Sequence, residues 1–219
     1  MRKYRRDGTK IVPRRKSVAP KYFRPGDKKK LLDYLKPLKG FDARRDMAIF
    51  HVGFMAGLRA DELFSMTVED VLPERKTIPV MGKGDVYREV PISADLRKEL
   101  DDYLRAKKQV GESLEPGAPL WCSSGDKPLA YRSVQAVIER RCIQAGLIDN
   151  KDGRQRVRYS THCLRHTFAI EWLTRHGNMG LSEAYTKLAL IMGHEDVRTT
   201  QKYTRFDVTE MEVEKEDAA

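Results

Sequence analysis

The segment between residues 188 and 205 places the tightest constraint on how this chain can fold. Its apolar residues recur at helical spacing and end at Gly193, a residue suited to close a helix. His194 follows directly, and a second short helix is expected to begin near Asp196 and to carry Tyr203. A turn between two helices would direct the imidazole and the phenol into the same space. The tyrosine is flanked by basic residues, which favour a nearby anion over simple packing: Arg198, Lys202 and Arg205.

The charge of the chain points toward a polyanionic partner. Its 219 residues carry a formal net charge of +10, which is typical of proteins that bind nucleic acid. Residues 1–24 hold a net charge of +9 and residues 207–219 a net charge of −5, so residues 25–206 retain +6. The basic excess therefore extends beyond the N-terminal segment. Composition alone is equally compatible with an ordinary soluble domain that carries a basic tag.

Several other classes of protein are disfavoured by composition. No apolar run is long enough to span a membrane, and the basic N-terminus is not followed by the apolar segment of a secretion signal. The three cysteines include no CxxC pair, which argues against a zinc site and favours reduced thiols in a cytoplasmic protein. No group of carboxylates has metal-ligand spacing, so no metal is expected.

Hydrophobic periodicity predicts a mainly α-helical fold with a small antiparallel β-sheet. A short helix is expected after Gly57, and longer helices are expected over residues 27–35, 43–56, 93–108, 131–145, 162–173 and 182–193. Their expected N-cap residues have short polar side chains: Asp27, Ser93, Ser160 or Thr161, and Ser182.

Residues 76–92 change from helical to alternating periodicity. Residues 77–80 and 86–92 are expected to form two strands, with Lys83 between two glycines at the turn of the hairpin. A second segment, residues 150–158, is compatible with either a basic loop or a weak hairpin. Residues 1–25 are expected to form a disordered basic arm or a linker, and residues 207–219 an acidic tail, on either side of one domain over residues 26–206.

A set of polar residues near the expected helix boundaries suits phosphoryl transfer. Arg59 and Arg165 lie near helix starts, where backbone dipoles favour anions, and a guanidinium group offers a planar fork to phosphate oxygens. His162 shares a helical face with Arg165, and both His162 and His194 can exchange protons near neutral pH. Tyr203 is the candidate nucleophile beside this basic set.

Each of these residues alone is weak evidence for function. Arg59 is equally well explained as the partner of Glu62 at a helix terminus, and His162 alone is more often a capping or core residue. A lysine at a hairpin tip, such as Lys83, is usually only solvated, although the flanking glycines would also let it enter a groove.

Four short blocks together resemble the tyrosine recombinase family, also called the phage integrases. They are residues 57–63 (GLRADEL), 82–84 (GKG), 162–166 (HCLRH) and 190–194 (LIMGH), followed by Tyr203. The blocks stand in the family's order, and the resemblance covers roughly residues 26–206. It implies the mainly helical catalytic domain of enzymes that cut and rejoin duplex DNA at specific sites without a metal or nucleotide cofactor. It also implies a homo-tetramer assembled on DNA, with an accessory DNA-binding protein as a further candidate partner.

The resemblance assigns the covalent and proton-transfer steps to three residues. Tyr203 would attack the scissile phosphate, form a 3′-phosphotyrosyl bond and release a 5′-hydroxyl. Lys83 would protonate the leaving 5′-oxygen, and His162 would assist proton transfer from Tyr203. Because the phosphotyrosyl bond conserves the energy of the phosphodiester, another 5′-hydroxyl could reseal the strand without ATP.

The resemblance assigns the binding of the phosphate to a second group of residues. Arg59 and Arg165 would hold the non-bridging oxygens, and His194 would donate a hydrogen bond to the phosphate. Glu62 matches a supporting acidic position and is expected to orient Arg59 or its neighbours.

The sequence departs from the family pattern in three places. Most members carry a separate DNA-clamping domain before the catalytic one, so this chain is expected to be either a minimal recombinase or a fragment. The segment over residues 175–185 is longer than usual, and Asp61 stands where a small hydroxyl residue is common. Two alternative functions stay open: a DNA-relaxing enzyme like the type IB topoisomerases, which share this chemistry, and an inactive DNA-binding regulator.

Overall fold

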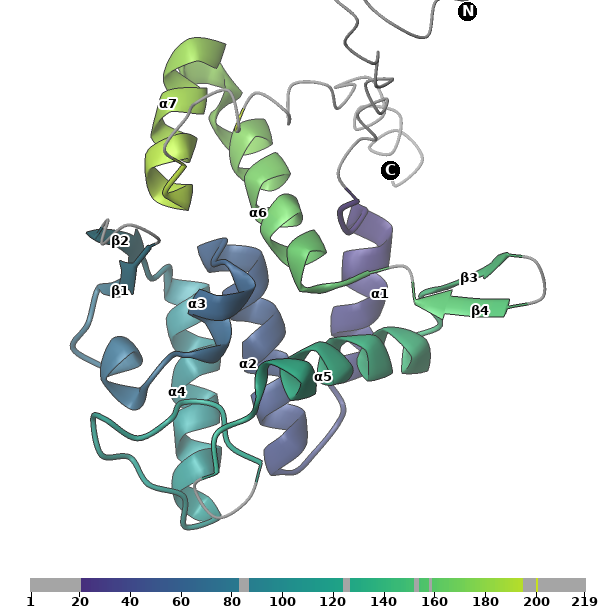
Figure 1. The fold of residues 1–219 in the computed structure, drawn as a ribbon, viewed down its shortest axis with the longest axis vertical. Coiled ribbons are helices and arrows are strands. Elements are labelled where there is room, and N and C mark those ends of the chain that lie inside the picture. Colours follow the sequence, from purple (N-terminus) through teal and green to yellow (C-terminus); the bar gives the residue numbers. More distant parts are fainter. Residues whose placement is uncertain are drawn as a thin grey trace, which may run out of the picture.

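The computed structural model describes residues 21–82, 87–123, 127–151, 154–157, 159–194 and 200. These residues form mainly helices, with two antiparallel two-stranded sheets (Figure 1). The helices are α1 (Pro25–Leu35), α2 (Phe41–Ala56), α3 (Ala60–Phe64), α4 (Ala94–Gln109), α5 (Tyr131–Gln144), α6 (Thr161–His176) and α7 (Leu181–Met192). Short 3-10 turns lie at Val68–Val71 and Gly177–Met179. No helix in the described ranges is long and apolar enough to cross a membrane.

The strands form two hairpins far apart in the sequence. Strand β1 (Thr77–Met81) pairs with β2 (Tyr87–Pro91), and β3 (Ile148–Lys151) pairs with β4 (Arg154–Val157). The predicted mainly helical fold with a small antiparallel sheet is therefore confirmed. The second hairpin, which the sequence left open, is formed and extends away from the helices (Figure 1).

Helix α2 lies at the centre of the hydrophobic core. Most of its residues are buried, including Ile49, Phe50 and Phe54, and it packs against α4 and α6. A helix that is apolar around most of its circumference needs neighbours on several sides. Helices α4 and α6 supply them, and α6 thereby brings its first turns next to the end of α2.

The folded domain begins before residue 26, where the sequence had placed its boundary. The Phe23 side chain is buried, its ring stacks on Tyr159 at a centroid distance of 3.8 Å, and its backbone N–H donates to Thr167 Oγ1 at 2.8 Å. A single aromatic residue in a basic segment has no periodicity that would reveal its burial. The rest of the expected arm, residues 1–20, lies outside the described residues.

Two of the N-cap residues predicted from the sequence, Asp27 and Ser182, do not cap their helices. Helix α1 begins at Pro25, a residue well suited to the first turn, so Asp27 lies inside the helix and accepts a hydrogen bond from the Tyr159 hydroxyl. Helix α7 begins at Leu181, so Ser182 also lies inside its helix.

The other expected caps occupy the predicted positions. Ser93 Oγ accepts from the Leu96 N–H at 3.3 Å, which confirms the predicted cap of α4. Ser160 stands at the N-cap position of α6, but its side chain accepts no capping hydrogen bond. Gly193 closes α7 in the left-handed conformation, as expected.

Two glycines of the α2 region allow α6 to approach closely. A β-carbon added at Gly53 would lie 2.6 Å from Leu164 Cδ1, and one added at Gly57 would lie 2.2 Å from Phe168 Cδ1. Gly57 also has a φ of +60°, which an L side chain rarely adopts. This contact places Arg165, which lies between Leu164 and Phe168 on α6, beside the end of α2.

Replacing Gly53 by alanine tests this contact. We expect Gly53→Ala to lower the free energy of unfolding by about 1–3 kcal/mol, because the added methyl group forces Leu164 or the helix to move. Gly26→Ala in α1 is the matched control, since no atom lies within 4 Å of its added β-carbon. The control should be neutral or stabilising by up to about 1 kcal/mol. Urea unfolding followed by circular dichroism measures both, and equal effects would contradict the close-contact interpretation.

Candidate active site

Arg59 stands at the N-terminus of α3, directly after the turn at Gly57 that ends α2. Its backbone N–H donates to Glu62 Oε2 at 2.7 Å, which is half of a capping box. Its guanidinium donates to Glu62 Oε1 at 2.8 Å and to the Gly193 carbonyl at 2.5 Å. The Arg59 side chain remains 36% exposed, so it faces both the protein and the solvent.

Arg165 is more deeply placed, in the second turn of α6. Its guanidinium donates to the Gly57 carbonyl at 2.5 Å and to the Met192 carbonyl at 2.6 Å. It also lies 3.2 Å from His194 Nε2, and His194 Nδ1 lies 2.7 Å from Thr200 Oγ1. These contacts join the end of α2, α6 and the end of α7.

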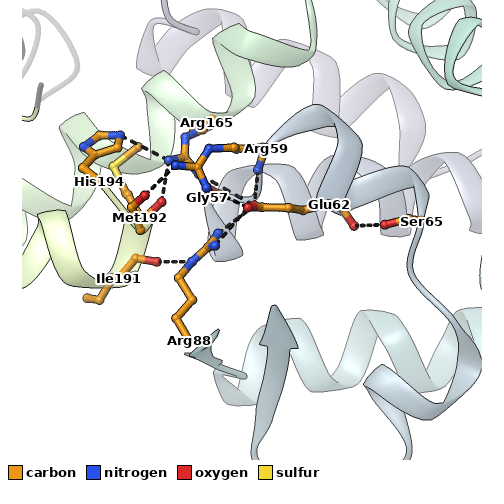
Figure 2. A network of polar contacts seen from close by, with 10 residues as sticks. Gly57, Arg59, Glu62, Ser65, Arg88, Arg165, Ile191, Met192 and His194 are labelled. Carbon is orange, nitrogen blue, oxygen red and sulfur yellow. Dashed lines mark hydrogen bonds and ion pairs between the residues drawn. The ribbon is translucent and has the colours of Figure 1, made fainter. Parts of the chain in front are cut away.

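A third arginine, Arg88 of β2, completes this arrangement, and the sequence analysis missed it. Its Nη1 and Nη2 atoms donate to Glu62 Oε1 at 2.9 Å and to Glu62 Oε2 at 2.6 Å (Figure 2). Its Nε atom donates to the Ile191 carbonyl at 2.9 Å. One signal could have found it: Arg88 alternates in step with the buried Val90, and an arginine on the buried face of a strand requires a partner.

The three arginines contact three successive carbonyls at the end of α7. Arg88 binds the carbonyl of Ile191, Arg165 that of Met192, and Arg59 that of Gly193 (Figure 2). The last carbonyls of a helix lack partners within the helix and carry the negative end of its dipole. The end of α7 is therefore an internal acceptor that holds the guanidinium groups together.

Glu62 supplies the formal negative charge of the cluster. Burial alone would raise the pKa of its carboxyl, but hydrogen bonds from Arg88, the Arg59 backbone and the Arg59 side chain outweigh burial and lower the pKa to about 2. Arg165 Nη1 lies 4.0 Å from the same carboxylate. One carboxylate thus faces three guanidinium groups, and the remaining positive charge favours an anion at this site.

Two further histidines lie in the first two turns of α6. His162 is exposed on the first turn of the helix. Burial, together with the nearby His162 and Arg165, lowers the pKa of His166 to about 4. His166 is therefore neutral near pH 7 and adds no positive charge to the site.

The structure brings together four of the seven residues that the sequence singled out: Arg59, Glu62, Arg165 and His194. His162 lies one helical turn before Arg165. Lys83 and Tyr203, with the expected helix near Asp196, lie outside the described residues. In the described ranges, no group of three or more His, Cys, Asp or Glu side chains could hold a metal ion.

The fold and the arginine cluster define a mainly helical domain with a preorganised site for an anion. Residues 21–210 match the model of the phage integrase family, and the chain belongs to that family. A curated relative, the tyrosine recombinase XerC of Shewanella amazonensis, is 31% identical over 91% of this chain and 61% of its own length.

Solved structures show the same fold. The XerA recombinase superposes with a TM-score of 0.69 at 25% identity, over 93% of this chain and 66% of its own. The XerH site-specific recombinase bound to its difH substrate has a TM-score of 0.67 at 20% identity, over 95% of this chain and 58% of its own. The chain spans about half to three fifths of the length of the first curated relatives, between 49 and 61%.

The lowered pKa of Glu62 predicts how stability depends on pH. The folded pKa of about 2 lies below the ordinary 4.5, so Glu62 contributes its full stabilisation above pH 4.5 and loses it as the pH falls toward 2. The shift corresponds to about 3 kcal/mol. We expect Glu62→Gln to lower the free energy of unfolding by about that amount at pH 7 and by progressively less below pH 4.5.

Urea unfolding of wild type and variant between pH 7 and pH 3 measures this difference. Glu69→Gln is the control, because Glu69 forms an exposed ion pair with Arg75 that is worth at most about 1 kcal/mol. A difference between wild type and Glu62→Gln that stays constant down to pH 3 would contradict the lowered pKa.

Proposed function

We propose that this chain is a tyrosine site-specific recombinase that cuts and rejoins duplex DNA through a 3′-phosphotyrosyl intermediate. The observation that carries the proposal is the convergence of Arg59, Arg165 and His194 at the end of α7. From that point the chain continues to Tyr203, nine residues after His194. Membership of the phage integrase family supports the same reaction.

The two arginines perform the work that a metal ion performs in other phosphoryl-transfer enzymes. Arg59 and Arg165 bind the non-bridging oxygens of the scissile phosphate and neutralise the charge that develops on them. The partly exposed Arg59 guanidinium is accessible to a DNA phosphate at the surface. His194, beside Arg165, adds a hydrogen bond to the phosphate.

The remaining steps belong to three residues. Tyr203 attacks the phosphorus and becomes linked to the 3′ end of the cleaved strand, and His162 assists the transfer of its proton. Lys83 protonates the departing 5′-oxygen. The bond energy stays in the phosphotyrosyl link, so attack by a 5′-hydroxyl restores the DNA and regenerates the tyrosine.

The proposed partners are duplex DNA and further copies of the same chain, which assemble as a tetramer on that DNA in the cytoplasm. The XerH relative in a solved structure is bound to its difH substrate. The catalytic unit corresponds to residues 26–206 together with the buried Phe23. The basic arm lies along the DNA backbone, and residues 207–219 form an acidic tail.

Removing the phenolic hydroxyl tests the proposed chemistry. We expect Tyr203→Phe to abolish covalent attachment to nicked duplexes made from DNA that flanks the gene, because the nucleophilic oxygen is lost. DNA binding should remain nearly unchanged, since the ring and the arginines stay. Denaturing gels detect the covalent adduct and gel shifts detect binding; an adduct that persists in Tyr203→Phe would exclude this tyrosine as the nucleophile.

The arm is tested by deleting residues 1–20, which carry a net charge of +7. This deletion keeps Phe23 and so leaves the core intact. Each phosphate contact contributes roughly −0.9 to the slope of log affinity against log salt concentration, so about four contacts correspond to a slope change of about 3.6. Affinity should fall similarly for specific and random duplexes, because phosphate contacts carry no sequence information. An unchanged slope would mean that the arm is a passive linker.

A further inference from the structure

Arg88 has no role in the reaction proposed above, yet its side chain makes three hydrogen bonds in the cluster, whereas the Arg59 side chain makes two. Its side chain is only 7% exposed, and its three nitrogen atoms all donate: two to Glu62 and one to the Ile191 carbonyl. These contacts connect β2 with α3 and with the end of α7 (Figure 2).

Stability alone does not account for this buried pair. Withdrawing two charges from water is costly, and replacing a buried ion pair by apolar side chains of similar volume is often neutral or stabilising. Apolar side chains in place of both Arg88 and Glu62 would satisfy the packing beside Val90, whereas removing Arg88 alone would leave the Glu62 carboxylate without its bidentate partner. The arrangement of the hydrogen bonds therefore indicates that Arg88 orients the groups to which it donates.

We infer that Arg88 is a positioning residue for strand cleavage: it locks the Glu62 carboxylate, which in turn holds the Arg59 guanidinium in the orientation that binds the scissile phosphate. The inference rests on the proposed function. Both Glu62 oxygens are shared: Oε1 accepts from Arg59 Nη1 and Arg88 Nη1, and Oε2 accepts from the Arg59 backbone and Arg88 Nη2. The carboxylate cannot rotate without breaking several of these four hydrogen bonds.

Without Arg88, the carboxylate keeps only its two bonds to Arg59, three residues away in sequence. Arg59 then has a single hydrogen bond to α7, at the Gly193 carbonyl, and the pair can turn together about that bond. Arg88 gives the carboxylate a second connection to α7, because its Nε atom donates a hydrogen bond to the Ile191 carbonyl. That carbonyl lies two residues before the Gly193 carbonyl to which Arg59 donates.

The absence of a side chain at Gly193 leaves space for Arg88. A β-carbon at Gly193 would lie 3.0 Å from Arg88 Nη1 and 3.1 Å from Arg88 Cδ. The glycine thus serves two purposes: it adopts the left-handed φ of +62° that ends α7, and it leaves room for the Arg88 side chain.

Arg88 could also affect cleavage through Lys83, and the experiment must distinguish this effect from the effect through Glu62 and Arg59. Arg88 lies on the strand that leaves the hairpin of Lys83, and it pairs with Val80 across the hairpin. Loss of Arg88 could therefore act on the proposed general acid instead of on Arg59. A substrate whose leaving 5′-oxygen is replaced by sulfur distinguishes the two routes, because sulfur departs without protonation.

The test measures the rate of covalent attachment to a nicked duplex with either oxygen or sulfur at the cleaved bond. Arg88→Met keeps the length of the side chain and removes its donors. We expect it to slow cleavage about 10²-fold on both substrates, the usual effect of a misplaced binding group. Lys83→Ala should lose rate on the oxygen substrate and recover on the sulfur substrate.

Arg97→Met is the matched control. Arg97 is also mostly buried, and its guanidinium donates to the backbone carbonyls of Val71 and Arg75 and to Asp101. It belongs to α4 and makes none of the contacts of the arginine cluster. This variant should lose stability to a comparable degree while cleaving within about threefold of wild type at a temperature where both remain folded.

A double variant tests the route through Glu62. If Arg88 acts by locking this carboxylate, Arg88→Met should add little to the loss caused by Glu62→Gln, because coupled residues are not additive. Arg88→Lys keeps the charge but cannot bind both oxygens in the forked geometry, so it should still lose at least about tenfold. If Arg88→Met does not fold, the rate of covalent attachment by Arg88→Lys tests the inference instead.

Failure of the inference and failure of the proposed function give different results. A wild-type chain that forms no adduct on any duplex, while binding DNA, would overturn the proposed function. If wild type cleaves, any of three results would overturn the inference. The Arg88 variants could cleave as fast as Arg97→Met, or Arg88→Met could regain its cleavage rate on the sulfur substrate. The double variant could also lose rate by the full product of the losses measured for Arg88→Met and Glu62→Gln alone.

Discussion

The end of α7 is held by three guanidinium groups, and those groups can lie together only because the buried Glu62 carboxylate lies among them. Arg59 and Arg88 each donate to both the carboxylate and a carbonyl at the end of α7, and Arg165 donates to the Met192 carbonyl between those two. Without the carboxylate and the helix dipole, like charges at such distances would repel one another. The cluster is therefore preorganised and still carries excess positive charge for an incoming phosphate.

The helical core places the parts of this cluster. Gly53 and Gly57 let α6 lie against α2, and the turn at Gly57 both exposes a carbonyl to Arg165 and directs the chain into α3 with Arg59 at its start. The contacts that position the arginines are thus continuous with the packing that stabilises the fold. A site held in this way pays little reorganisation energy when the phosphate arrives.

Much of this could be predicted from the sequence, because the helices are long and periodic and the short motifs fall at their ends. Arg59, Arg165 and His194 were predicted to meet, and the alternative interpretation of Arg59, a helix-terminal partner of Glu62, is confirmed as well. Arg88 was missed because hairpin periodicity was used to find the strands and not to ask which face each charge occupies. Phe23 was missed because one isolated aromatic residue carries no period, and two of its partners, Tyr159 and Thr167, lie more than a hundred residues away.

The central claim is that Tyr203 forms the covalent link to DNA at the arginine cluster. The most direct measurement is to isolate the covalent complex formed on a nicked duplex, digest the protein and the DNA, and locate the nucleotide-bearing residue by mass spectrometry. We expect a phosphonucleotide on Tyr203, linked through the 3′ end of the DNA, and a free 5′-hydroxyl on the released strand. A nucleotide on any other residue, or a link through the 5′ end, would contradict it.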